Sequence, residues 1–161
     1  MQERYWREMI QTKYSEFYID LYLENSVIMD RRINVLLAIA SCGSIASWAI
    51  WNQFALIWAL IVAASQVVSV IKPYLPYSKR VEDLYNYSSD IKGLYIKMEY
   101  DWFYVSNGDF TEEEINETLF KYKTEYNTFT GKHLQKDYLT MNDIIKAKAE
   151  SFVEEYFKKN Y

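Results

Sequence analysis

Apolar residues follow two kinds of pattern along this 161-residue chain, and the change between them divides it into three parts. Up to residue 32 they recur at three- and four-residue steps among charged residues, which is typical of an amphipathic helix. From residue 33 to 71 they run on without a single Asp, Glu, Lys, Arg, His or Pro. After residue 72 the helical spacing returns. The pattern predicts an all-α chain with an N-terminal helix (1–32), a two-helix hairpin (33–71) and a helical bundle (72–161).

The uncharged segment is long enough to cross a lipid bilayer twice. A transmembrane helix needs about 20 mostly apolar residues, and residues 33–51 and 53–71 each supply close to that number. The polar pair Asn52 and Gln53 lies near the middle and predicts a tight turn there. Helices of soluble proteins usually carry a charged face, and neither half of this segment has one. We therefore predict an integral membrane hairpin, with a hairpin buried in a soluble core as the alternative.

Basic residues flank the hairpin at both ends but are absent between its two halves. Arg31 and Arg32 precede it, and Lys72, Lys79 and Arg80 follow it. Because basic flanking residues are retained on the cytoplasmic side, both termini are predicted to be cytoplasmic. The predicted location is the inner (plasma) membrane of the cell, with the chain crossing it more than once.

The N-terminal helix carries its apolar stripe at three- and four-residue steps, at Ile10, Tyr14, Phe17, Leu21 and Ile28. No Gly or Pro separates this helix from the hairpin. The two are therefore expected to form either one continuous rod or a rod that bends near Asn25 and Ser26.

The third part predicts three helices. The first starts near Ser78, and its apolar positions have the near-heptad spacing of helices that pack along a seam: Val81, Leu84, Ile91, Tyr95, Met98, Trp102 and Val105. This seam suits packing on the chain's own helices and packing between copies equally well. The second helix begins after Thr111, a capping residue, and ends at Gly131. The third follows a capping pair formed by Thr140 and Asp143. His133 is expected to be a solvated loop residue.

The chemistry of most enzymes is missing from the sequence. One His and one Cys, Cys42 inside the hairpin, are too few for a zinc site or a Cys/His nucleophile. The sequence also lacks a glycine-rich phosphate loop and the common hydrolase motifs. A net charge of -4 does not indicate a nucleic-acid-binding protein. We predict no catalytic residues, no metal and no cofactor.

Polar residues inside the predicted spans are the strongest functional signal. Asn34, Ser41 and Ser44 fall on one broad face of the first half, and Gln66 and Ser69 share a face of the second. Polar side chains in lipid turn towards partners or water. One interpretation is that they pair the two helices of a single hairpin. The other is that they line the wall of a pore formed by a ring of copies, since two helices alone cannot enclose a conduit.

The flanking cations also have two interpretations. Arg31, Arg32, Lys72, Lys79 and Arg80 can bind the anionic headgroups of the bilayer. In a ring of copies they would surround the cytoplasmic mouth, where they could bind an anionic ligand such as a nucleotide or short oligonucleotide.

This layout resembles the SLATT-type two-transmembrane effectors of bacterial anti-phage conflict systems. The features shared are the N-terminal helix, the basic pair Arg31 and Arg32, the tight hairpin over 33–71 and the aromatic-rich helical tail. The resemblance implies an oligomeric pore, here expected as a tetramer-like ring, that is controlled by a nucleotide made by a partner nucleotidyltransferase. It favours the pore over simple helix pairing. The alternative function is a non-conducting, membrane-anchored scaffold whose cytoplasmic helices bind a protein partner.

Overall fold

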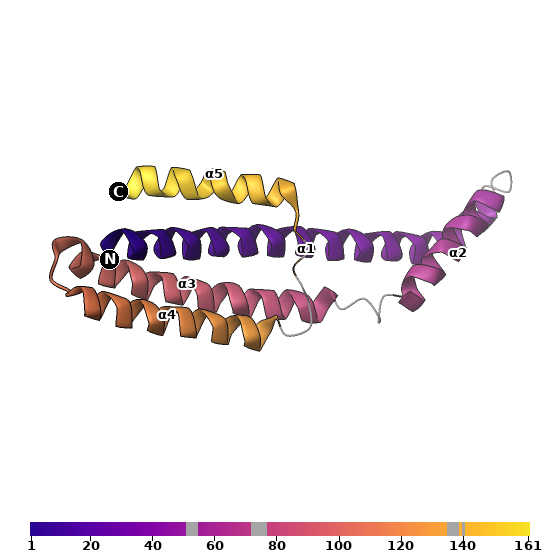
Figure 1. Cartoon of the computed structure of the whole chain (residues 1–161). Helices are drawn as coiled ribbons and strands as arrows, with labels where there is room; N and C mark the ends of the chain where they lie inside the picture. The colour runs from indigo at the N-terminus through magenta and orange to yellow at the C-terminus, as the bar shows by residue number, and fades with distance from the viewer. Residues whose placement is uncertain (51–54, 72–76, 135–138, 140) are drawn as a thin grey trace. The chain divides into compact units, whose positions relative to one another are not determined.

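The computed structural model describes residues 1–50, 55–71, 77–134, 139 and 141–161. These residues form helices and no strand, which confirms the all-α class. The helices are α1 (Gln2–Ile50), α2 (Ala55–Ile71), α3 (Tyr77–Asn107), α4 (Glu112–His133) and α5 (Asp143–Asn160) (Figure 1). The predicted turn at Asn52 and Gln53 lies outside the described residues.

The chain divides into two compact units. Unit 1 combines residues 1–24 with residues 82–161, and unit 2 comprises residues 25–81. The sequence predicted the N-terminal helix and the C-terminal bundle as separate parts, whereas the structure packs the first half of α1 into that bundle. Helix α1 runs from Gln2 to Ile50 and therefore contributes to both units. Its helical structure is not interrupted at Asn25 and Ser26.

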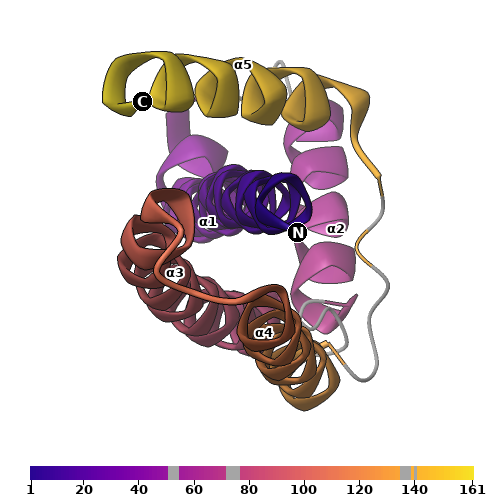
Figure 2. The same ribbon diagram turned by 60° about the vertical axis from the view of Figure 1, so that its left-hand side comes forward.

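Within unit 1, the first half of α1 lies between the α3–α4 pair on one side and α5 on the other (Figures 1 and 2). Towards α3, the Tyr5 hydroxyl donates a hydrogen bond to the carbonyl oxygen of Met98 at 2.9 Å. Towards α5, the rings of Trp6 and Phe157 meet edge to face with centroids 5.1 Å apart. Helix α1 is thus the central element of the bundle, packed on two faces.

The near-heptad seam predicted in α3 faces the interior of unit 1. Its members Leu84, Ile91, Tyr95, Met98 and Val105 are all buried. The seam is shared between two core clusters, each of which includes residues of α1 and α4: Tyr95, Met98 and Val105 belong to one, and Leu84 and Ile91 belong to the other. For this face of α3, packing on the chain's own helices is what the structure shows.

The predicted apolar stripe of the N-terminal helix is wrong in position. The most buried residues of α1 are Tyr5, Met9, Thr12, Lys13, Glu16 and Ile19, whereas Phe17 is only half-buried against Phe152 of α5. Because α1 is covered on two sides, burial follows its place in the bundle and not its most apolar face.

Three helix ends test the capping predictions. The predicted start of α4 is confirmed, since Thr111 and Glu114 form a reciprocal capping box. The predicted end at Gly131 is wrong, because α4 continues to His133. The cap predicted at Thr140 lies outside the described residues. The described N-cap of α5 is Asn142, whose Oδ1 accepts hydrogen bonds from the backbone amides of Ile144 and Ile145 at 3.0 and 3.3 Å.

Unit 2 contains the second half of α1 and all of α2. Within the part of the chain that the structure describes, no helix has both the length and the apolar character required to cross a membrane.

Candidate functional site

The two helices of unit 2 meet along an apolar groove. It has a volume of about 310 Å³ and is lined by Ile33, Leu36 and Leu37 of α1 and by Ile61, Ala64, Ser65 and Val68 of α2. The polar residue of the lining is Ser65, whose hydroxyl group donates a hydrogen bond to the carbonyl oxygen of Val62 at 2.8 Å. Its hydrogen bond therefore stays within its own helix, and the helix–helix contact is made by aliphatic side chains.

Three of the residues predicted to line a pore, Asn34, Gln66 and Ser69, do not line this groove. Gln66 and Ser69 are exposed on α2, and each residue step turns a helix by about 100°, so Gln66 is rotated away from its groove-lining neighbour Ser65. Asn34 donates a hydrogen bond from Nδ2 to Oδ2 of Asp30 at 2.9 Å, one turn earlier in α1. Ser41 and Ser44 lie in α1 where only the backbone is described.

Ser65 is the polar residue of this region that the sequence analysis missed. Its signal was present in the spacing, because Ile61, Ala64, Ser65 and Val68 recur at the i, i+3, i+4, i+7 positions of one helical face. Gln66 is the more polar residue, but it falls outside this regular stripe.

The predicted cationic set is only partly within the described side chains. Arg31 and Arg32 are exposed on α1, and Arg80 is half-buried in the first turn of α3. Lys79 lies in α3 where only the backbone is described, and Lys72 lies outside the described residues. Among the described side chains of this set, the adjacent guanidinium groups of Arg31 and Arg32 are exposed to solvent, where they can bind phosphate oxygens.

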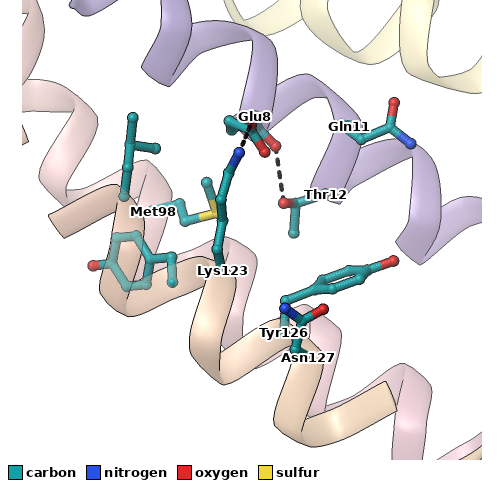
Figure 3. A pocket seen from close by; sticks show the side chains of 9 residues that line it. Glu8, Gln11, Thr12, Met98, Lys123, Tyr126 and Asn127 are labelled. Atoms are coloured by element: carbon teal, nitrogen blue, oxygen red, sulfur yellow. Dashed lines mark hydrogen bonds and ion pairs between the residues drawn. The ribbon is translucent and has the colours of Figure 1, made fainter. Parts of the chain in front are cut away.

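Unit 1 contains a second concave site, between α1, α3 and α4 (Figure 3). Its volume is about 310 Å³, at the lower end of the range for ligand pockets. Lys123 of α4 reaches across it to Glu8 of α1, with Nζ and Oε1 2.6 Å apart. The pocket lining includes no histidine or cysteine, and its facing ionic groups already neutralise each other. It supplies a crevice bridged by an ion pair but not a catalytic set.

A buried ion pair forms the electrostatic centre of unit 1. Lys13 Nζ lies 3.0 Å from Oε2 of Glu16, and each side chain is only 10% exposed. The same ammonium group lies 4.3 Å from the ring centroids of both Tyr95 and Tyr156, which is within the range of cation–π attraction. This burial has no local signal in the sequence, because Lys and Glu three residues apart usually form a solvated pair.

Beside this pair, Glu99 of α3 gathers three tyrosine hydroxyl groups. Its Oε1 accepts hydrogen bonds from Tyr95, Tyr156 and Tyr161 at 3.3, 2.9 and 3.1 Å. Burial, followed by the hydrogen bond to Glu99, raises the pKa of Tyr161 to about 12. The cluster joins α3 to α5 through paired groups, so its role is structural.

His133 is not the solvated loop residue that the sequence predicted. It is the last residue of α4, its side chain is 6% exposed, and its Nε2 lies 2.8 Å from Oδ2 of Asp90 in α3. The hydrogen bond from His133 is the main cause of the lowered pKa of Asp90. The nearby hydroxyl of Thr130 is hydrogen-bonded to Tyr87. The pair therefore clamps α3 to α4.

Metal binding has no support among the residues that the structure describes, since no group of three or more His, Cys, Asp or Glu side chains is arranged to hold an ion.

The comparisons with known proteins give no relative. The chain matches no protein-family model, and no curated protein and no solved structure matches it.

Proposed function

We propose that this chain is an oligomeric membrane effector whose hairpin, residues 33–71, inserts into a bilayer and lines an ion-conducting pore. The observation that carries the proposal is the surface of unit 2. Large aliphatic side chains of both helices are exposed there: Val35, Leu36, Ile39, Leu56, Ile57, Leu60, Ile61, Val67, Val68, Val70 and Ile71. Such a contiguous apolar surface indicates a membrane or another protein surface.

The magnitude of this exposure supports a lipid environment. Full burial of one Val, Leu or Ile side chain is worth about 1.5–3 kcal/mol. Several of these side chains are mostly exposed; for example, Leu36 is 67% exposed and Leu56 is 74% exposed. Covering the whole set would therefore be worth on the order of 10 kcal/mol. No charged residue interrupts the sequence from residue 33 to 71, so lipid tails would cover it without burying a charge.

Orientation follows from the exposed basic pair at the start of the hairpin. Arg31 and Arg32 suit the phosphate-rich cytoplasmic surface of the inner membrane, which leaves both termini and unit 1 in the cytoplasm.

A pore is favoured over a passive anchor by the position of Gln66 and Ser69. Both side chains are exposed on α2 outside the groove between the helices. A polar amide facing lipid tails is unfavourable, so this face of α2 suits a neighbouring copy or a water-filled path. A ring of copies, of which a tetramer is the simplest case, would provide both. The uncharged wall would give modest ion selectivity.

Control by an anionic ligand is the second element of the proposal. In a ring of copies, Arg31 and Arg32 would be repeated around the cytoplasmic mouth with Lys72, Lys79 and Arg80. A nucleotide-type ligand made by a partner nucleotidyltransferase would bind there, with an affinity that falls steeply as salt is added. The layout shared with SLATT-type effectors supports a role in anti-phage defence.

The test is ion flux through liposomes that contain the purified chain. We expect flux from the wild type in at least one of two conditions, with a nucleotide or without it, and a several-fold change of that flux in Gln66→Leu and Ser41→Leu. Val70→Leu is the matched control, because it replaces one exposed apolar side chain of α2 with another. Absence of flux under every condition would contradict the pore.

Replacement of the hairpin separates the pore from the scaffold. If replacement of residues 33–71 by an unrelated membrane hairpin preserves the biological activity, the hairpin only anchors unit 1.

A further inference from the structure

Helix α3 has a second apolar face, opposite the seam that packs inside unit 1. This outer face comprises residues that recur at three- and four-residue steps and are not used by any other described helix: Tyr85, Ser89, Gly93, Ile96, Tyr100 and Phe103. Its four large side chains, Tyr85, Ile96, Tyr100 and Phe103, are between 62% and 66% exposed. The face lies entirely within unit 1 and is distinct from the apolar surface of unit 2.

The area of the outer face is a substantial part of what a stable dimer needs. A buried aromatic side chain covers about 150–250 Å², so four large side chains that are about two-thirds exposed offer on the order of 500 Å². A standard interface buries about 800 Å² on each partner. The outer face would thus supply well over half of that area, and polar residues at its borders would supply the remainder.

Two lysines at the border of the outer face are neutralised within unit 1. Lys92 Nζ lies 2.8 Å from Oδ2 of Asp20, and Lys97 is paired with Glu125. The exposed Glu82 lies at the N-terminal end of the face, three residues before Tyr85. From Tyr85 to Phe103 the face therefore offers aromatic and aliphatic contact beside lysines that are already paired. This suits an equally neutral apolar surface better than a nucleic acid or a strongly charged peptide.

Gly93 provides an independent reason to expect a close helix–helix contact. It lies in the middle of α3, where Gly is the least favourable residue apart from Pro. A Cβ atom added at this position would meet no other atom within 4 Å, so nothing inside the chain requires Gly there. A second helix that crosses α3 at this position would require Gly93, because the missing side chain lets two backbones approach closely.

We propose that the outer face of α3 packs against the same face of α3 in a second copy of this chain. The contact is isologous, with Ile96 near the two-fold axis and Tyr100 and Phe103 packed across it. This proposal assigns one of the contacts within the proposed homo-oligomer to the cytoplasmic unit. It rests on the proposed function for its role in the membrane.

Gly93→Ala tests the proposal because it should increase the stability of the folded chain and at the same time weaken the association between copies. Ala favours helix, so the melting temperature of unit 1 should rise by about 4 °C or more. The added methyl group should hold the two helices apart and raise the dissociation constant between copies about tenfold. Both quantities are measured on the full chain in lipid nanodiscs or detergent, by near-ultraviolet circular dichroism and by analytical ultracentrifugation.

Charge substitution gives the larger effect. Ile96→Glu should abolish the α3 contact and lower the number of copies per particle. The matched control is Ile144→Glu, since Ile144 is an 80% exposed Ile of α5 outside this face, and it should leave the number unchanged. In a Cys42→Ser background, Ile96→Cys should form an intermolecular disulfide under mild oxidation, and Ile144→Cys should not.

The proposal is overturned if Gly93→Ala and Ile96→Glu both leave the dissociation constant unchanged, or if the two cysteine variants cross-link equally. These results would leave ion flux untouched, so the pore could still stand. Conversely, a chain that cross-links through Ile96→Cys but never conducts would retain the α3 contact and contradict the pore.

Discussion

Units 1 and 2 place the same kinds of side chain in opposite positions. In unit 1, Tyr5, Met9, Ile91 and Leu119 are almost fully buried, and even Lys13 is shielded from water. In unit 2, aliphatic side chains cover the outside of a two-helix pair. The first arrangement is stabilised by water outside and apolar contact within. The second lacks an interior of that size, so its stability depends on what surrounds it.

The two units also differ in how they treat polar groups. Unit 1 buries charges and hydroxyl groups but pairs them, as with Lys13 and Glu16 or Tyr122 and Asp101. Unit 2 leaves Gln66 and Ser69 on its surface, beside aliphatic neighbours. A paired buried group stabilises one fold. An exposed polar group on an otherwise apolar surface instead suits a path for water or a contact with another copy.

The largest expected effect comes from breaking the buried ion pair of unit 1. Lys13→Met removes the ammonium group and leaves Glu16 buried without its charge partner, which should lower the free energy of unfolding by about 3–5 kcal/mol. The measurement is thermal unfolding followed by near-ultraviolet circular dichroism. Lys92→Met, at an exposed ion pair with Asp20, is the control and should cost about 1 kcal/mol or less.

A double variant identifies the cause of that loss. Lys13→Met with Glu16→Leu should recover most of the stability, because no unpaired charge remains. If the double variant is as unstable as Lys13→Met, the packing of the lysine stem against Tyr95 and Tyr156 matters more than the charge.

Unit 2 should respond to charge through the membrane and not through its own folding. Leu60→Arg puts a cation near the middle of the second predicted span, where it should cost about 3 kcal/mol of insertion free energy, or about 100-fold in partition. The measurement is the fraction of the chain that resists extraction from membranes by alkaline carbonate. Ile144→Arg, on the exposed surface of unit 1, should have no effect. Equal extraction of both variants and the wild type would count against insertion.

The helices of unit 1 were largely predictable because their signals are local. Thr111 with Glu114 fixes the start of α4, and the three- and four-residue spacing of Ile91, Tyr95 and Met98 fixes the buried face of α3. Gly108, which follows Asn107 at the end of α3, has a φ of 80°, a backbone conformation that Gly adopts without steric cost.

The failures arise where distant segments meet. The burial of Lys13 depends on Tyr156, 143 positions later in the chain, and the burial of His133 depends on Asp90 in another helix. Neither partner can be identified from local spacing. For the same reason the sequence could not show that the N-terminal helix is the centre of the C-terminal bundle.

Alkaline pH should weaken unit 1 selectively. Burial is the main cause of the raised pKa values of Tyr5, Tyr87, Tyr95 and Tyr122, whereas residues 25–71 contain no tyrosine. In the unfolded chain these hydroxyl groups lose their protons near pH 10. Their contribution to stability is therefore complete below about pH 10 and is lost as the pH rises towards the folded-state pKa values.

The measurement for this prediction is the melting temperature of unit 1 between pH 7 and pH 11. Tyr122→Phe should make the fall of this melting temperature above pH 10 less steep. Tyr85→Phe should not, because Tyr85 is exposed. Identical slopes in both variants would show that the buried tyrosines do not govern the alkaline loss.

The smallest expected effect concerns the clamp between His133 and Asp90. His133→Ala removes the hydrogen bond that lowers the pKa of Asp90 and should destabilise unit 1 by about 1 kcal/mol at neutral pH. A lowered folded-state pKa means that the contribution is present above the unfolded value, near pH 4, and is lost as the pH falls through the folded value. The stability difference between wild type and variant should therefore shrink below about pH 4. A difference that persists unchanged at pH 2–3 would assign the effect to the packing of the ring on Tyr87, 6.2 Å away between centroids, and not to the carboxylate.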